Sequence, residues 1–128
     1  MASTEARQAG QESRAGARWE RRAEALLCAQ GMQCVARNHR CRGGELDLVM
    51  LADQQLVFVE VRYRRGVRFG TAAESVDARK QQRLIRAAED FLMRFPQFAN
   101  HPCRFDVMAL YGDADAPGCD WIAGAFSA

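Results

Sequence analysis

The sequence predicts an α/β fold in which a mixed central sheet is flanked by helices. Two kinds of periodicity support this prediction: apolar residues recur at helical spacing in two long segments and alternate at strand spacing in several shorter ones. Elements of both kinds bury their apolar faces against one another in layers. The predicted order along the 128 residues is α, β, β, β, α, β, within one domain that spans residues 16–128.

The first predicted helix starts at Gly16. Apolar residues recur from there at three- and four-residue steps, and Gly31 is a natural stop signal. Residues 1–15 are polar and have no sustained apolar period, so they are predicted to form a flexible tail. After the helix, a short extended segment is expected over residues 32–37, followed by a polar connection over residues 38–44.

Two strands form the centre of the predicted sheet. The first, residues 45–51, places Leu46 and Leu48 on one face and Asp47 on the other, because side chains alternate along a strand. The second, residues 55–64, is rich in valine and aromatic residues, which favour strands. A tight turn between the two segments predicts that they pair as an antiparallel hairpin.

The rest of the chain is predicted to contain a second long helix and a further strand. A glycine-containing loop is followed by apolar residues in helical register over residues 76–95, with Ser75 or Asp77 as the cap. Residues 105–111 form the next predicted strand. Residues 121–126 either add one more strand or pack against the others.

The charge of the chain is unevenly distributed. The net charge is only +2, yet the segment from Val61 to Arg86 contains eight basic residues and two acidic ones. A basic segment on an otherwise mildly acidic chain is typical of proteins that bind a polyanion, so nucleic acid is the expected partner. The alternative is a solvated arginine face without a partner.

Several features argue for a reduced, cytoplasmic environment. Five cysteines form an odd number, the first residues contain no secretory pattern, and no CxxC pair or histidine cluster indicates a zinc site. The cysteines are expected to be reduced and to fill small spaces in the core. No apolar stretch is long enough to cross a membrane.

Neither the histidines nor four of the aromatic residues are predicted to have a functional role. His39 and His101 lie in polar segments without partners at ligand spacing, so both are expected at the surface. Four aromatic side chains at core spacing are expected to pack inside rather than to stack on bases: Trp19, Phe58, Phe91 and Phe95.

Glu60 is the main anomaly in the sequence, because it interrupts an otherwise apolar strand. Buried strands rarely contain a charge unless it is paired or binds something. Pairing the two central strands brings Asp47 towards Glu60, and two carboxylates with water and phosphate are a common ligand set for Mg²⁺. The alternatives are a salt bridge from Glu60 to Arg62 or to an arginine on a neighbouring element, and water-facing carboxylates at Asp47 and Glu45.

The segment 43–92 resembles the YraN-like family of small bacterial proteins. The resemblance extends to the G-x-x-x-E-x-x-A pattern that starts at Gly16, to the pair that starts at Arg37, and to R-F-D at residues 104–106. That family is assigned to the PD-(D/E)XK, or restriction-endonuclease-like, fold and resembles archaeal Holliday-junction resolvases. The resemblance therefore implies a mixed sheet with helices around a metal-dependent nuclease site.

The resemblance also assigns roles to individual residues. It implies that Asp47 and Glu60 bind Mg²⁺ or Mn²⁺, with the carbonyl of Val61 as a further ligand. The helix-one glutamate of the family falls on Glu20, and Glu24 is the alternative one turn later. Periodicity alone leaves another interpretation of Glu20, as an exposed glutamate favoured by the helix dipole.

The basic residues depart from the fold's pattern at one position. Arg62 stands where the fold usually has a lysine, and arginine cannot act as a general base, although it can stabilise phosphate charge. Lys80, the only lysine, lies on the apolar stripe of the second helix, where it either contacts phosphate or extends to solvent. The arginines expected to contact the nucleic-acid backbone are Arg64, Arg65, Arg68, Arg79 and Arg83.

The function predicted from these residues is hydrolysis of DNA phosphodiester bonds by a divalent-metal-dependent endonuclease. Branched DNA is the substrate that analogy with the resolvases suggests, and a homodimer is expected on the same ground. Two alternatives belong to other classes. One is a nuclease-fold module that binds nucleic acid without cutting, which the arginine at position 62 favours, and the other is a protein-interaction domain.

Overall fold

The computed structural model describes residues 4–64, 76–113 and 115–128. It contains two α-helices, five strands and a short 3₁₀ helix within those residues. In chain order, these elements are α1 (Thr4–Ala29), β1 (Gln33–Cys41), β2 (Gly44–Ala52), β3 (Gln55–Arg64), α2 (Ala78–Arg94), η2 (Pro96–Phe98), β4 (Cys103–Asp113) and β5 (Ala116–Phe126).

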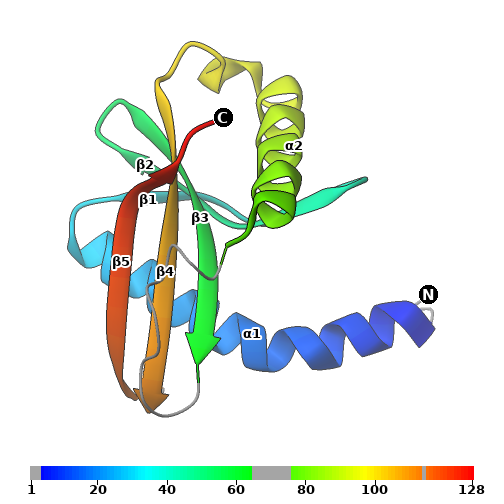
Figure 1. Ribbon diagram of the computed structural model, residues 1–128, viewed down its shortest axis with the longest axis vertical. Helices are drawn as coiled ribbons and strands as arrows, with labels where there is room; N and C mark the ends of the chain where they lie inside the picture. Colours follow the sequence, from blue (N-terminus) through cyan, green and yellow to red (C-terminus); the bar gives the residue numbers. More distant parts are fainter. Residues whose placement is uncertain (1–3, 65–75, 114) are drawn as a thin grey trace.

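The five strands form one mixed sheet in the order β1-β2-β3-β4-β5. Neighbouring strands are antiparallel except β3 and β4, which are parallel. Parallel neighbours require a crossover, and α2 lies between them in the chain. The helices lie on opposite faces of the sheet, with α2 on one side and α1 crossing the other (Figure 1). The predicted mixed sheet with flanking helices is therefore confirmed.

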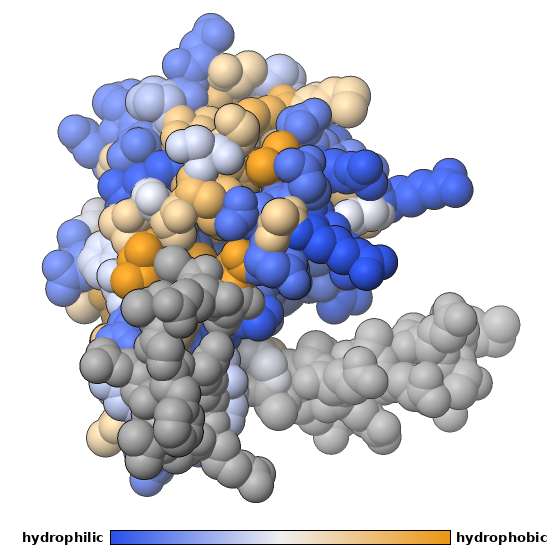
Figure 2. Space-filling model, viewed as in Figure 1, coloured by the Kyte–Doolittle hydropathy of each residue, from blue (hydrophilic) through white to orange (hydrophobic). Residues whose placement is uncertain are grey.

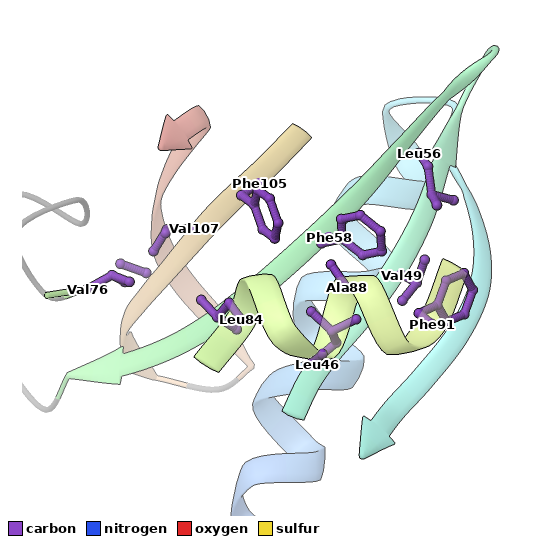
Figure 3. Close-up of a cluster of buried hydrophobic side chains, with 12 residues drawn as sticks. Leu46, Val49, Leu56, Phe58, Val76, Leu84, Ala88, Phe91, Phe105 and Val107 are labelled. Carbon is purple, nitrogen blue, oxygen red and sulfur yellow. The ribbon is translucent and has the colours of Figure 1, made fainter. Parts of the chain in front are cut away.

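The larger part of the core lies between α2 and the sheet. Leu84, Ala88 and Phe91 of α2 point towards the strands (Figure 3). Phe58 of β3 and Phe105 of β4 meet them from the sheet, with ring centroids 5.3 Å apart. A second cluster lies on the opposite face, where Ala23 and Leu27 of α1, together with Met32, cover buried residues of three strands: Leu48, Met50, Val57, Val59, Met108 and Leu110.

Helix α1 starts earlier than predicted. It begins at Thr4 rather than at Gly16, so most of the segment predicted as a tail is helical. Residues 4–15 are rich in alanine, glutamate, glutamine and arginine, which favour helix without requiring an apolar period. The predicted stop is correct: Gly31 has φ 94°, and the amides of Gly31 and Met32 bond to the carbonyls of Cys28 and Leu27 in a Schellman motif.

Strand β1 is longer than predicted, and β2 does not alternate regularly. β1 continues through Cys41, because the polar segment pairs with β2 instead of forming a loop. The β1–β2 register shifts between Cys34 and Ala36 and is continuous from Ala36 to Cys41. Leu46 packs in the core cluster under α2, whereas Leu48 packs in the cluster under α1, so the prediction that they share one face was wrong.

The remaining elements agree closely with the prediction. β3 has the predicted bounds, and the turn before it contains Asp53 at φ 58°. α2 begins at Ala78, two residues later than predicted, because Asp77 is the cap: its carboxylate accepts a hydrogen bond from the Lys80 amide at 2.8 Å. The last segment forms a full strand, β5, which gives the order αβββαββ in place of αβββαβ.

Several predictions about individual side chains were wrong. The five cysteines are free thiols, as predicted, but none is fully buried: Cys34, Cys41 and Cys119 are half-buried and pack against the core clusters, whereas Cys28 and Cys103 are exposed. Phe95 is 38% exposed, whereas Phe58 and Phe91 are buried as predicted. His39 is not a surface residue without a partner: its ring nitrogen lies 2.7 Å from the carboxylate of Asp90, and its side chain is 11% exposed.

The helices of this fold are not membrane-spanning. Within the described ranges, neither helix combines the length and the apolar character that crossing a bilayer requires.

Candidate active site

The candidate site lies where β2 and β3 separate. The β2–β3 ladder runs from Ala52↔Gln55 to Leu48↔Val59 and ends there. Beyond that point, β2 pairs only with β1, and β3 pairs with β4. The separation leaves the next residue of each strand, Asp47 and Glu60, without a strand-to-strand backbone contact between them.

Asp47 is fixed in this opening by a backbone hydrogen bond. The amide of Val61 on β3 donates to Oδ2 of Asp47 at 2.8 Å. The carboxylate thus occupies the position at which a continued ladder would supply a backbone carbonyl. A buried amide needs such an acceptor, so the bond both satisfies Val61 and holds Asp47 against β3.

Asp47 and Glu60 form a close carboxylate pair. Glu60 is 4% exposed, in contrast with most glutamates in proteins. Burial raises the pKa of Asp47 to about 9, and the charge of Glu60 and a hydrogen bond between the two side chains act in the same direction. The Val61 amide opposes these effects. Two acids that interact this directly do not ionise independently, so the pair retains a proton at neutral pH when no cation is bound.

Two cations contact Glu60 from different elements. The Nζ atom of Lys80, on the first turn of α2, lies 3.2 Å from Oε2 of Glu60. A guanidinium nitrogen of Arg62, two residues further along β3, lies 3.5 Å from the same oxygen. The predicted salt bridge between Glu60 and Arg62 is therefore present, and Lys80 faces the site rather than extending away from it.

Glu20 reaches the same region from α1. It is half-buried, and burial raises its pKa, as do the charges of Glu45 and Glu60, while a hydrogen bond from the Asn38 side chain opposes them. Glu24, the alternative candidate, has a different role, because both of its oxygens bond to Arg37, at 2.6 and 2.7 Å. Of the two, Glu20 is thus the one that lies near the carboxylate pair.

The oxygen ligands of this site suit a divalent cation. Asp47 and Glu60 would repel each other if both were ionised, and a hard cation bound between such carboxylates would relieve that repulsion. Within the described part of the chain, no three His, Cys, Asp or Glu side chains are placed to hold a metal ion together. Among the described residues, Asp47 and Glu60 are thus the two carboxylates available to such an ion, and the Val61 carbonyl, water or substrate would complete its ligands.

The predicted backbone-binding arginines are only partly described. Arg79 and Arg83 are exposed on the first two turns of α2, on the helix that carries Lys80. Arg64 is the last residue of β3. Arg65 and Arg68 lie outside the described residues.

Comparison with known proteins identifies the family. Residues 19–110 match the model described as "Uncharacterised protein family UPF0102". The chain belongs to the UPF0102 family. The predicted resemblance to the YraN-like family is thereby confirmed, since the two names refer to the same family.

Individual UPF0102 proteins are similar over most of their length. One from Pseudomonas putida strain GB-1 is 52% identical over 119 residues, which cover 92% of this chain and 97% of the relative. One from Stutzerimonas stutzeri strain A1501 is 53% identical over 110 residues, covering 83% and 92%. One from Saccharophagus degradans is 49% identical over 105 residues, covering 82% and 86%.

This UPF0102 chain contains a second buried acid to which the sequence analysis gave no role. Asp106 on β4 is 1% exposed. Its carboxylate accepts hydrogen bonds from Nε of Arg104 at 3.0 Å, the Trp121 indole at 2.8 Å and the Gly124 amide at 3.0 Å. These bonds join β4 to β5 at an irregularity in their register. The signal was the same as for Glu60, a carboxylate in an apolar strand, but here the partners are structural.

Proposed function

We propose that the chain is a divalent-metal-dependent endonuclease of the PD-(D/E)XK type that hydrolyses phosphodiester bonds in DNA in the cytoplasm. The observation that carries this proposal is the close carboxylate pair of half-buried Asp47 and buried Glu60, with the Lys80 ammonium 3.2 Å from Glu60. An unreactive structural domain has no need of two mutually repelling acids in one opening of its sheet. Membership of the UPF0102 family is compatible with the proposal but names no activity.

Asp47 and Glu60 are the residues that would hold Mg²⁺ or Mn²⁺, with the carbonyl of Val61 beside them. When bound, such an ion polarises the phosphoryl group and assists the ionisation of water. The chain itself keeps both carboxylates in place, Asp47 through the Val61 amide and Glu60 through its two cationic partners.

Lys80 and Arg62 supply positive charge for the scissile phosphate. Both contact Glu60 and both are partly exposed, at 36% and 37%, so a phosphate oxygen can reach them. Charge that develops on the phosphoryl oxygens in the transition state is stabilised by such fixed donors. Glu20, whose pKa is raised by burial, is suited to accept a hydrogen bond or a proton from the attacking water.

The arginines around this opening would bind the nucleic-acid backbone without reading its sequence. Arg79 and Arg83 on α2 are the described candidates, and Arg64, Arg65 and Arg68 extend the basic segment along the chain. We further propose, by analogy with the junction resolvases, that branched DNA is a substrate and that two copies act together to cut two strands.

A second function is favoured by one specific observation. Arg62 replaces the lysine of the fold's motif, and Glu60 already has Arg62 and Lys80 as partners, so its charge is compensated without a metal ion. A domain of this kind could bind nucleic acid through its basic residues and not cut it. The two functions differ in whether a metal ion causes strand cleavage.

A cleavage assay separates the two proposals. Purified protein is incubated with supercoiled plasmid and with a four-way DNA junction, in Mg²⁺, in Mn²⁺ and in EDTA. Asp47→Asn and Glu60→Gln test the carboxylate pair. Glu89→Gln is the matched control, because it neutralises an exposed glutamate on the outer side of α2.

The endonuclease proposal expects cutting that requires metal, persists in Glu89→Gln and falls by about two orders of magnitude or more in the two site variants. Salt-sensitive binding without cutting, in every metal tested, would favour the binding module. If the wild-type protein neither binds nor cuts at low salt, both proposals are wrong.

A further inference from the structure

A pocket adjoins the carboxylate pair on the side of α2. It has a volume of about 320 Å³ and lies between the turn that joins β1 to β2 and the first two turns of α2. Its lining consists of Arg40, Cys41, Gly43, Gly44, Glu45, Lys80 and Arg83. Lys80 both lines this pocket and lies 3.2 Å from Glu60, so the pocket opens directly beside the candidate active site.

The walls of the pocket are held together by direct backbone packing. A Cβ atom on Gly44 would lie 2.0 Å from the carbonyl oxygen of Arg83, so only glycine allows the turn to approach α2 this closely. Gly43 has φ 101°, a conformation that favours glycine, and the side chain of Arg86 lies 3.6 Å from where its Cβ would be. The turn and the helix therefore form one fixed junction.

The pocket is strongly basic. Three of its lining residues, Arg40, Lys80 and Arg83, are cations, and Glu45 is the only acid among them. Glu45 pairs with Arg40 at 3.2 Å. Among the residues that the structure describes, no carboxylate forms an ion pair with Arg83. Around α2, many hydrophilic residues lie at the surface, with hydrophobic ones between them (Figure 2).

We infer that this pocket binds one internal backbone phosphate of a DNA substrate, adjacent to the phosphate that is cut. The inference rests on the proposed function and adds to it a second phosphate position, formed by the β1–β2 turn. Guanidinium groups bind phosphate oxygens through paired donors, and Arg40 and Arg83 present two of them from opposite walls. Because Lys80 is shared, a bound backbone would pass from the pocket directly onto Glu60 and Asp47.

Glu45 gives the inference a distinctive consequence. Its carboxylate competes with phosphate for Arg40, because the two side chains already form an ion pair. Removing the charge of Glu45 should therefore strengthen DNA binding, while removing either arginine should weaken it. On a solvated charged surface without a defined site, these substitutions would change DNA affinity only through the net charge, with no special effect of Arg40, Glu45 and Arg83.

The first test measures affinity for a fluorescein-labelled DNA duplex by anisotropy in EDTA, so that no cutting occurs. Arg40→Gln and Arg83→Gln should each weaken binding about tenfold. Each should also lower the slope of log Kd against log salt concentration by about one, because one fewer counterion is released. Glu45→Gln should strengthen binding about threefold. Arg94→Gln is the control: it also removes one charge from α2, but at the far end, where Arg94 pairs with Asp90. Thermal melts verify that all four variants are folded.

The second test asks whether the interaction involves one phosphate. Single linkages of the duplex are replaced in turn by uncharged methylphosphonates. For the wild-type protein, a defined pocket predicts a marked loss of affinity at one or two linkages, and the same linkages should matter little to a double variant, Arg40→Gln with Arg83→Gln. Equal small losses at every linkage, or identical profiles for both proteins, would overturn the inference.

These results distinguish the pocket from the catalytic proposal. If the wild-type protein cuts DNA but the pocket variants bind no worse than Arg94→Gln, the inference of a phosphate-binding pocket is wrong and the endonuclease proposal is supported. If the protein binds DNA without cutting it and the pocket variants weaken binding, the phosphate-binding pocket is supported and the endonuclease proposal is wrong. If the protein binds no DNA at low salt, both fail.

Discussion

The carboxylate of Asp47 accepts a hydrogen bond from the backbone amide of Val61, 2.8 Å away, at the point where β2 leaves β3. The side chain substitutes for the backbone acceptor that the ended ladder no longer supplies. One bond therefore caps the strand pair and holds Asp47 beside Glu60. The end of the β2–β3 ladder thus causes both the opening in the sheet and the placement of the two acids beside each other.

Asp47→Asn should stabilise the metal-free protein at alkaline pH. The pKa of Asp47 is raised to about 9, far above its value of about 3.9 in an unfolded chain. Between those two values the folded state holds a proton that the unfolded state has released, so stability falls as pH rises through this window. Asparagine keeps an oxygen acceptor for Val61 and adds an amide donor towards Glu60, without the charge.

The measurement is urea unfolding in EDTA at several pH values. At pH 8 the variant should be more stable by about 1.4 kcal/mol or more, which corresponds to one pKa unit, and at pH 4 the two proteins should be nearly equal. Asp53→Asn, an exposed aspartate in the turn before β3, is the control and should leave the pH dependence unchanged. A wild-type stability that rises between pH 5 and pH 8 would contradict the assignment.

Divalent cations should stabilise the wild-type protein against heat. A ligand that binds only the folded state adds about 2.7 kcal/mol at one hundred times its Kd. Mg²⁺ or Mn²⁺ should therefore raise Tm at pH 8, where ionisation of the Asp47–Glu60 pair costs stability without a cation. In Asp47→Asn and Glu60→Gln the shift should be reduced to that given by the same ionic strength of NaCl. An equal shift in the wild type and both variants would place any bound ion elsewhere.

Asp106→Ala should destabilise the protein strongly. The substitution leaves the Arg104 guanidinium, the Trp121 indole and the Gly124 amide without the acceptor that they share. Breaking a buried charged network of this kind costs about 3–5 kcal/mol. Urea unfolding should show a lower midpoint, whereas Asp113→Ala, on the exposed end of the same strand, should change stability by less than about 0.5 kcal/mol. Similar midpoints for the two variants would mean that Asp106 is not a structural centre.

The central hairpin was predictable from the sequence because both strands are continuous and apolar. β3 has the predicted bounds, and the second helix was displaced only by the cap at Asp77. β1 was not predictable to its end, because residues 38–41 are polar and become a strand only through pairing with β2. The change of face between Leu46 and Leu48 was equally hidden, since periodicity assumes regular alternation.

The carboxylate pair was predictable from one anomaly, a glutamate in an apolar strand. The same reasoning applied to Asp106 would have identified a buried acid but not its partners, because Trp121 and Gly124 lie on a strand that the sequence left open. The basic pocket was beyond prediction. Arg40 and Arg83 are far apart in the chain, and only the packing of Gly44 on the backbone of α2 brings them to one site.

Substitutions of Arg62 test whether the residue at this position contributes only positive charge or also takes part in proton transfer. If it contributes only positive charge beside Glu60, Arg62→Lys should retain metal-dependent cutting within about threefold, because lysine keeps the charge and is the residue usual in the proposed nuclease motif. Arg62→Gln should lower kcat by about one hundredfold, the typical loss when one electrostatic donor is removed.

The pH profile of single-turnover cutting decides the remaining point. Arginine cannot act as a general base, so the wild-type profile must depend on other groups, and Arg62→Lys should follow it up to the pH at which lysine deprotonates. Cutting that rises in Arg62→Lys with a new alkaline limb would mean that a lysine at this position takes a proton itself. Equal rates for Arg62→Gln and the wild type would remove Arg62 from the mechanism and leave Lys80 as the cation that acts beside Glu60.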